Sequence, residues 1–190
     1  MWFGQVLSAT AMHADMVARA WLVWDLTGSS ASVASVLIAR AVPMLILGLI
    51  GGVAADRFNR RNLLMIIQGW TMLMHVLMAV LLLTDLIELW HVYVLAFGLG
   101  AGLAMTQPVR TSIIPNLVEK KDMLNAMSLN SIAINSTRFI GPAAISALII
   151  LTDVGWAYIW ATAAYGLVLW STGKIAVSYT HLTLPTKRIV

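Results

Sequence analysis

Residues 32–54 read SVASVLIARAVPMLILGLIGGVA, and Arg40 is the only charged side chain in this run of 23 residues. A helix needs about 20 mostly apolar residues to cross the hydrocarbon core of a bilayer, which is about 30 Å thick. The run is therefore long enough to span a membrane. It is followed at once by ADRFNRRN at residues 55–62, a polar and basic segment that has to lie outside the hydrocarbon.

The composition of the whole chain is that of a membrane protein. Of its 190 residues, 60% are hydrophobic and 11% are charged, against about 45–50% and about 25% in ordinary soluble domains. A soluble domain of this length needs a polar surface that 12 basic and 8 acidic side chains could hardly provide. The chain has no cysteine, which excludes disulfides, thiolate metal sites and cysteine nucleophiles.

Six apolar stretches of spanning length alternate with short polar connections. We therefore predict an all-α membrane protein in which residues 1–177 form one bundle of six transmembrane helices. The predicted spans are residues 5–26, 32–54, 63–84, 90–113, 126–151 and 156–177. Residues 178–190 are polar, threonine-rich and too short to span. They are either a native cytoplasmic tail without fixed structure or non-native sequence at the end of a truncated gene.

The charges of the connections predict the orientation, because cytoplasmic loops carry an excess of Lys and Arg. Alternate connections must lie on opposite sides of the membrane. One set holds only acidic charges, namely Asp25, Asp85, Glu88 and Asp153, whereas the other holds the basic residues Arg57, Arg60, Arg61, Lys120 and Lys121. We predict that the basic set and both termini are cytoplasmic, in a multi-pass protein of the plasma (inner) membrane.

Four charged residues fall deep inside the predicted spans: Asp15, Arg19, Arg40 and Arg138. Each costs about 2.5–3.5 kcal/mol at the bilayer centre and is therefore rarely left facing lipid. Asp15 and Arg19 are spaced i, i+4, so they lie on one helix face and can pair. Counted from the cytoplasmic ends at about 1.5 Å per residue, the arginines lie at roughly 20 Å depth and Asp15 at about 15 Å. Two interpretations stay open: an ion-pair network that only fixes helix packing, or a proton-coupling or substrate pathway.

Two other features of the spans are less specific. Glycines and prolines occur within several helices, where small residues allow close helix approach and proline removes a backbone hydrogen bond. The methionine-rich run at residues 65–78 is interpreted as lipid contact or core.

The most specific motif covers the end of the second span and the next loop, with Gly52, Asp56, Arg57, Arg60 and Arg61. It resembles the loop signature of the major facilitator superfamily, in which Asn59 here replaces a second glycine. Other segments are similar to the drug and siderophore exporter branch, which includes enterobactin exporters and macrolide efflux proteins. They are Gln5 with Ser8, Asp15, Trp21 to Val23, Leu26 to Ser29, Pro43, Pro108, Pro115 to Val118, Asn125 with Ala126, Leu129 to Ser131, Arg138, and Gly141 with Pro142.

This resemblance covers about residues 3–177 and implies a fold. Such transporters have two six-helix halves, each built of two inverted three-helix repeats, and the chain resembles the N-terminal half. Arg40 with Pro43 in the second span is echoed by Arg138 with Pro142 in the fifth.

The resemblance also implies roles for particular residues. Asp56 and its arginines would latch the cytoplasmic side, and Gly141 with Pro142 resembles the kink of the antiporter motif in helix five. Ile145 and Ser146 stand in place of the final pair of that motif.

The function that the resemblance implies is secondary active export of amphipathic small molecules by alternating access, coupled to protons. Its partners would be the lipid bilayer, the small-molecule substrate, protons and a C-terminal half, with no nucleic acid and no cofactor. An uptake carrier for an anionic solute and a non-transporting assembly or sensing protein remain alternatives. Enzyme chemistry has no support, because the sequence has no metal-ligand cluster, nucleophile motif or phosphate-binding loop.

Overall fold

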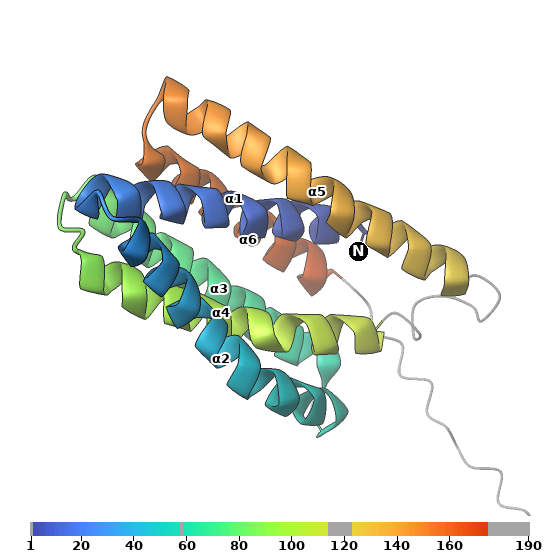
Figure 1. The fold of residues 1–190 in the computed structure, drawn as a ribbon. Helices are drawn as coiled ribbons and strands as arrows, with labels where there is room; N and C mark the ends of the chain where they lie inside the picture. The colour runs from blue at the N-terminus through green and yellow to red at the C-terminus, as the bar shows by residue number, and fades with distance from the viewer. Residues whose placement is uncertain (1, 58, 114–122, 175–190) are drawn as a thin grey trace, which may run out of the picture.

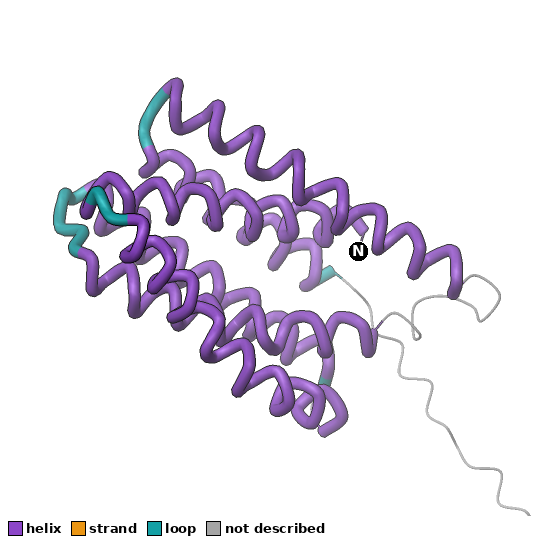
Figure 2. Tube along the Cα trace, in the orientation of Figure 1, coloured by secondary structure: helices purple, strands orange, loops and turns teal. Residues whose placement is uncertain are grey.

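The structure, a computed structural model, describes residues 2–57, 59–113 and 123–174. Within these ranges the chain forms six α-helices and no strand (Figures 1 and 2). The helices are α1 (Trp2–Thr27), α2 (Ser30–Arg57), α3 (Arg60–Leu83), α4 (Leu89–Ile113), α5 (Met123–Leu151) and α6 (Val154–Gly173). The predicted all-α class is confirmed for the described residues.

The helices match the six predicted stretches, but most of them are longer. α1 begins at Trp2 and α2 continues to Arg57, in each case three residues beyond the predicted limit. Hydropathy detects the part of a helix that crosses hydrocarbon, whereas backbone hydrogen bonding continues into the polar interface. α6 ends earlier, at Gly173, with Lys174 as its C-cap. The predicted tail, residues 178–190, lies outside the described residues.

Two capping residues explain where α1 ends and where α3 begins. Gly28 has a positive φ of 60°, and its N–H donates a hydrogen bond to the carbonyl of Trp24 at 2.7 Å, which closes α1 as a left-handed glycine cap does. Asn59 is the N-cap of α3, and its Oδ1 accepts hydrogen bonds from the N–H groups of Arg61 at 3.1 Å and Asn62 at 3.3 Å. Its φ is −59°, so asparagine acts here as a helix cap and not as a substitute for glycine at positive φ.

The six helices form two groups of three. α1 packs mainly against α5 and α6, and α4 packs mainly against α2 and α3. α3 and α6 pack against each other and join the groups, which Figure 1 shows as an upper and a lower layer. We call the boundary between α1, α5 and α6 on one side and α2, α3 and α4 on the other the seam. The connections α1–α2, α3–α4 and α5–α6 lie together at the left end of the bundle in Figure 2.

Glycines allow close helix contact within each group. A Cβ on Gly141 of α5 would come within 2.8 Å of the carbonyl oxygen of Thr10 in α1. A Cβ on Gly100 of α4 would overlap the carbonyl oxygen of Arg40 and lie 2.8 Å from Cγ of Pro43 in α2. α5 runs continuously through Gly141 and Pro142. The small residues therefore bring α5 onto α1 and α4 onto α2, as glycines do at membrane helix interfaces.

The outside of the bundle is strongly apolar. Leu45 is 79% exposed, Phe139 80% and Ile150 80%, and such surfaces need an apolar environment or a partner. Within the described residues, four helices are long and apolar enough to cross a membrane, at Ser30–Gly48, Arg61–Leu83, Leu89–Arg110 and Met127–Leu151. α1 falls outside this set and carries Asp15 and Arg19, whose side chains are buried in the bundle.

Candidate functional site

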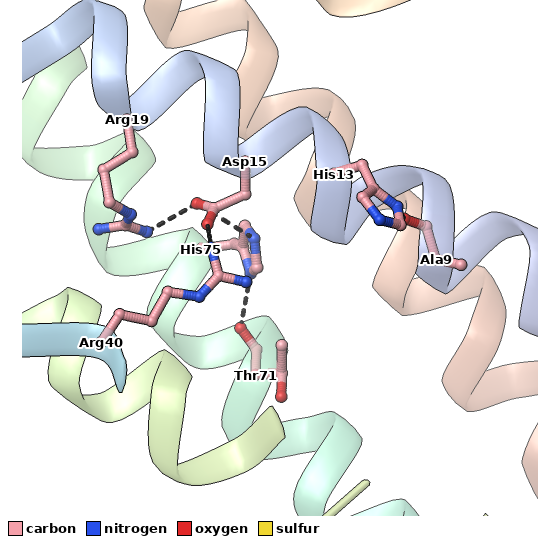
Figure 3. Close-up of polar contacts among 7 residues, drawn as sticks. All are labelled: Ala9, His13, Asp15, Arg19, Arg40, Thr71 and His75. Carbon is pink, nitrogen blue, oxygen red and sulfur yellow. Dashed lines mark hydrogen bonds and ion pairs between the residues drawn. The ribbon is translucent and has the colours of Figure 1, made fainter. Parts of the chain in front are cut away.

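Asp15 lies at the centre of a buried charged cluster (Figure 3). Its Oδ1 accepts a hydrogen bond from Nη2 of Arg19, one turn further along α1, at 2.6 Å. Its Oδ2 accepts a hydrogen bond from Nη1 of Arg40 in α2 at 3.3 Å. We call Asp15, Arg19, Arg40 and His75 the Asp15 cluster. The pairing predicted from the i, i+4 spacing is confirmed, and Arg40 joins it from a second helix.

The two arginines of the cluster are held differently. The Arg19 side chain is 1% exposed, and its guanidinium carbon lies 6.0 Å from the ring centroid of Tyr158 in α6. The Nε and Nη1 atoms of Arg19 donate no hydrogen bond in the described part of the chain. The Arg40 side chain is 12% exposed, so it is the less buried of the two. One carboxylate thus faces two guanidinium groups, which leaves the cluster with excess positive charge.

His75 of α3 is the member of the cluster that the sequence analysis missed. Its Nδ1 lies 2.8 Å from the carbonyl oxygen of Thr71, an acceptor only, so Nδ1 carries the proton and donates. Nε2 then faces Oδ1 of Asp15 at 3.8 Å, and it makes no hydrogen bond within the described residues. The ring also stacks on Tyr165 of α6, with centroids 5.1 Å apart. A proton added at Nε2 would turn this nitrogen into a donor facing the carboxylate.

The methionine-rich run that contains His75 has both exposed and buried side chains, in agreement with its interpretation as lipid contact or core; Ile66, for example, is 69% exposed. Met74 is 6% exposed and Met78 is fully buried. A single histidine in such a run has no periodic partner in the sequence, and only the assembled helix bundle shows that it faces Asp15.

The Asp15 cluster crosses the seam between the two helix groups. Asp15 and Arg19 come from α1, in one group, whereas Arg40 and His75 come from α2 and α3, in the other. α1 and α2 each pack mainly against other helices. The Asp15–Arg40 ion pair is therefore a polar link between groups that are otherwise joined mainly through α3 and α6.

Arg138 and His13 lie apart from this cluster. Arg138 of α5 is exposed, and within the described residues it forms no ion pair with Asp15. Of the three arginines that the sequence placed in one layer with Asp15, Arg19 and Arg40 thus contact this carboxylate, and Arg138 does not. His13 has its Nδ1 2.8 Å from the carbonyl oxygen of Ala9, on its own helix (Figure 3). In the described ranges, no group of three His, Cys, Asp or Glu residues could hold a metal ion.

The loop motif lies where α2 ends and α3 begins. Gly52, Asp56 and Arg57 belong to the last turns of α2, and Arg60 is the first residue of α3. Their side chains lie outside the described part of the chain, so their latch role stays a prediction. The Arg61 side chain is described, and its Nη2 donates a hydrogen bond to the carbonyl oxygen of Gly173 at the end of α6. This contact ties the start of α3 to the end of α6.

Comparison with known families agrees with this architecture. A family model of the major facilitator superfamily (MFS), described as transmembrane secretion effector, matches residues 1–190. The chain belongs to the MFS. Membership of this transporter family points to transport and not to catalysis, as the sequence predicted.

Two curated MFS relatives are similar to parts of the chain. One is the uncharacterized MFS-type transporter YfiS of Bacillus subtilis (strain 168), 26% identical over 120 residues, which are 63% of this chain and 28% of that protein. The other is the staphyloferrin A transporter of Staphylococcus aureus (strain NCTC 8325 / PS 47), 30% identical over 124 residues, which are 65% of this chain and 31% of that protein. The matched part of this MFS chain thus spans less than a third of each relative.

Proposed function

We propose that this chain is the N-terminal six-helix half of a secondary active transporter that exports amphipathic small molecules by alternating access, coupled to protons. The observation that carries the proposal is the buried Asp15 cluster, in which one carboxylate joins side chains from three helices across the seam. Buried ionisable groups in membrane helices are costly and mark ion or substrate pathways more often than packing sites.

The pattern of helix contacts supports the half-transporter architecture. In an inverted repeat of three helices, α1 corresponds to α4, α2 to α5 and α3 to α6. This exchange converts the α1–α5 contact into the α4–α2 contact, and the α1–α6 contact into the α4–α3 contact, and all four occur. The α3–α6 contact maps onto itself. The two helix groups are therefore interchanged by the symmetry that such a half would have.

Proton uptake at the Asp15 cluster would change the link across the seam. While Asp15 is ionised, its carboxylate holds Arg19 within α1 and Arg40 from α2. A proton on Asp15 removes the charge that binds Arg40, and a buried ion pair that loses one partner is destabilised by about 3–5 kcal/mol. Arg40, the more exposed of the two arginines, is the one that would release and turn toward water, which would free α2 from α1.

His75 would complete this site from α3. A proton at its Nε2 creates a hydrogen bond donor 3.8 Å from Oδ1 of Asp15. The charged and titratable groups around this ring are Asp15 and Arg19 from α1, Arg40 from α2, and Tyr158 and Tyr165 from α6. We propose that Asp15 and His75 act together as the proton-binding pair.

The orientation of the protein belongs to the same proposal. The basic connection between α2 and α3 and both termini would be cytoplasmic. Asp56 with Arg57, Arg60 and Arg61 would then latch the cytoplasmic side in one state of the transport cycle. The contact from Arg61 to the end of α6 is consistent with a loop that couples neighbouring helix ends.

A second candidate is an uptake carrier for an anionic solute. The surplus of buried arginines over carboxylates favours it, because an incoming anion would offset this charge. The two candidates differ in the direction of flux: cells that express an exporter lose a preloaded compound faster than control cells, whereas cells with an uptake carrier gain it.

The proposal is tested with the full-length protein of the parent gene in inside-out membrane vesicles. A panel of amphipathic acids, bases and neutral compounds is assayed with and without an imposed pH gradient. We expect at least one compound to accumulate when the vesicle interior is acidic, and accumulation to stop when a proton ionophore collapses the gradient. Accumulation that ignores the ionophore would contradict proton coupling, and a panel without any transported compound would favour a non-transporting role.

A further inference from the structure

A second buried arginine lies outside the Asp15 cluster. Arg110 of α4 is 7% exposed, and its Nη2 donates a hydrogen bond to Oγ of Ser8 in α1 at 3.0 Å. None of the carboxylates that the structure describes forms an ion pair with Arg110. A guanidinium group cannot lose its charge in a protein, and burying such a charge without a counter-ion is costly. The site therefore favours an anion.

Arg110 lines a cavity of about 160 Å³ at the seam, which we call the Arg110 cavity. Side chains of both helix groups surround it, among them Ser8 of α1 and Tyr165 of α6 on one side, and Gln68 and Thr71 of α3 on the other. Its remaining wall includes apolar side chains such as Met12 and Leu103. An acidic group at Arg110 would thus have both apolar and polar neighbours.

Gln68 supplies a second polar side chain to the Arg110 cavity. Its side chain is 3% exposed, and its Oε1 accepts no hydrogen bond within the described residues. The oxygen and nitrogen of such an amide exchange places by a half-turn of its terminal bond. Gln68 can therefore present its N–H₂ group to an anion in the Arg110 cavity, beside the guanidinium.

The size of the cavity limits what it holds. A cavity of about 150 Å³ lined by apolar side chains accommodates a benzene molecule, whereas sites for whole drug-sized ligands measure about 300–1,000 Å³. The Arg110 cavity thus fits an acid group with a small apolar body, as one part of a larger ligand.

The Arg110 cavity also adjoins the Asp15 cluster. Thr71 lines the cavity and its carbonyl accepts the hydrogen bond of His75. Tyr165 lines the cavity and stacks on the same imidazole. A ligand in the cavity would therefore lie one residue layer from the proposed proton-binding pair.

We propose that Arg110 binds the acid group of a small amphipathic carboxylate, with Gln68 as a second donor, and that this cavity is a substrate subsite. The proposal rests on the proposed transport function and adds a substrate class to it. A guanidinium group pairs with a carboxylate through two parallel hydrogen bonds, which selects acids over neutral amides and amines.

Equilibrium binding tests the subsite without any transport. The full-length protein is held in phosphatidylcholine nanodiscs without a pH gradient, and benzoate, benzamide and benzylamine are titrated with ligand-observed NMR. We expect benzoate to bind and the two others to bind about tenfold more weakly or not at all, since one charge-assisted contact accounts for at least such a factor. Equal binding of benzoate and benzamide would overturn the proposal.

Matched variants assign the binding to Arg110. Arg110→Gln should weaken benzoate binding about tenfold or more, whereas Lys174→Gln, which removes a positive charge from an exposed position at the end of α6, should leave it unchanged. Arg110→Lys keeps the charge and should retain part of the affinity, and it provides the comparison if Arg110→Gln does not fold. Benzoate binding that survives in Arg110→Gln, or that is lost equally in Lys174→Gln, would contradict the assignment.

A last arm separates a substrate acid from a lipid headgroup. The titration is repeated in nanodiscs with one part in three of phosphatidylglycerol (about 33%), whose phosphate could compete for the same guanidinium. Unchanged benzoate binding supports a substrate subsite, and its loss would assign Arg110 to lipid.

Binding that depends on Arg110 in a protein without proton-coupled transport would leave the subsite standing and refute the proposed function. Proton-driven transport of acids that is unaffected by Arg110→Gln would support the proposed function and refute the subsite.

Discussion

Asp15 is the only buried carboxylate in the described part of the chain, and it contacts buried Arg19 and half-buried Arg40. Arg110 is buried against Ser8, which lies about two turns away from Asp15 on α1. A proton on Asp15 would increase this excess of positive charge, and a bound anion would reduce it. The proposed proton site and the proposed acid subsite share two neighbouring residues, Thr71 and Tyr165.

His75 supplies the first prediction. If Asp15 and His75 titrate together, the dependence of transport on pH reflects two coupled protonation steps. His75→Gln should leave a single protonation step, so the slope of log transport rate against pH should fall toward about 1. The matched control is His13→Gln, because both histidines donate from Nδ1 to the carbonyl four residues earlier, and only His75 faces Asp15. The rate is measured across pH in vesicles that carry the full-length protein.

Two outcomes would argue against a role of His75 in proton binding. One is an unchanged pH profile in folded His75→Gln protein. The other is an equal change in the His13→Gln control, which would point to a general effect of histidine loss.

Pairing within one helix could be predicted from the sequence, and pairing between helices only in part. The Asp15–Arg19 contact follows from i, i+4 spacing alone. Arg40 was expected near Asp15 because both were counted to a similar depth, and the same depth argument placed Arg138 there. Depth along a helix does not say which way a side chain points around it, and Arg138 lies on the exposed side of α5. The neighbours of His75 and Arg110 on other helices follow only from the packed structure.

At the scale of the helices, glycines determine how closely α1 meets α5. The nearest atoms to a Cβ on Gly141 would be the Thr10 carbonyl oxygen at 2.8 Å and Cβ of His13 at 3.1 Å. The Thr10 carbonyl oxygen belongs to the backbone and cannot move aside as a flexible side chain could. A methyl group at this position would therefore push the two helices apart.

This contact leads to the second prediction. Gly141→Ala should destabilise the protein by about 1–3 kcal/mol, the usual cost of overpacking, although alanine is the better helix former. Gly48→Ala is the matched control, because nothing lies within 4 Å of its Cβ position in α2, and it should be neutral or stabilise by up to about 1 kcal/mol. The free energy of unfolding is measured by denaturant titration in detergent micelles. Equal stability of the two variants would contradict the close α1–α5 contact.

Helix number and approximate limits could be predicted from hydropathy, but the partners of each helix could not. The spans are all apolar enough that no stripe marks a preferred neighbour, and lipid tails are as apolar as leucine. The presence of glycine at positions 100 and 141 predicted close approach in general. Which helices approach there depends on the whole packing, and the structure identifies them as α2 and α1.

At the scale of the whole molecule, the proposed function depends on the two groups of three helices and on the seam between them. The main contacts of α1 and α4 have the pattern that the proposed inverted repeat would give, and the Asp15 cluster and the Arg110 cavity both lie where the groups meet. In the proposed transporter, protons and substrate would enter at the seam while the outer surface faces lipid. The apolar exposed side chains of α2 and α5 agree with such an arrangement.

The third prediction concerns orientation in the membrane. In the full-length protein, a cysteine that replaces Asp85, in the acidic connection between α3 and α4, should react with an impermeant thiol reagent added outside intact cells. One that replaces Lys120, which lies outside the described residues, should react only after the cells are opened. The chain has no cysteine of its own that would interfere within it. Reversed labelling would overturn the proposed orientation.

The central claim is that Asp15 couples proton movement to transport, and the most direct test is to neutralise it and to measure two kinds of flux. Asp15→Asn in the full-length protein is reconstituted in liposomes, with Asp25→Asn as the matched control, since Asp25 is an exposed aspartate on the same helix. Size-exclusion chromatography and thermal unfolding establish that both variants are folded. We predict that Asp15→Asn loses transport driven by a pH gradient but retains exchange of substrate across the membrane, which needs no net proton movement, and that Asp25→Asn keeps both. Gradient-driven transport at the wild-type level in folded Asp15→Asn protein would contradict the account.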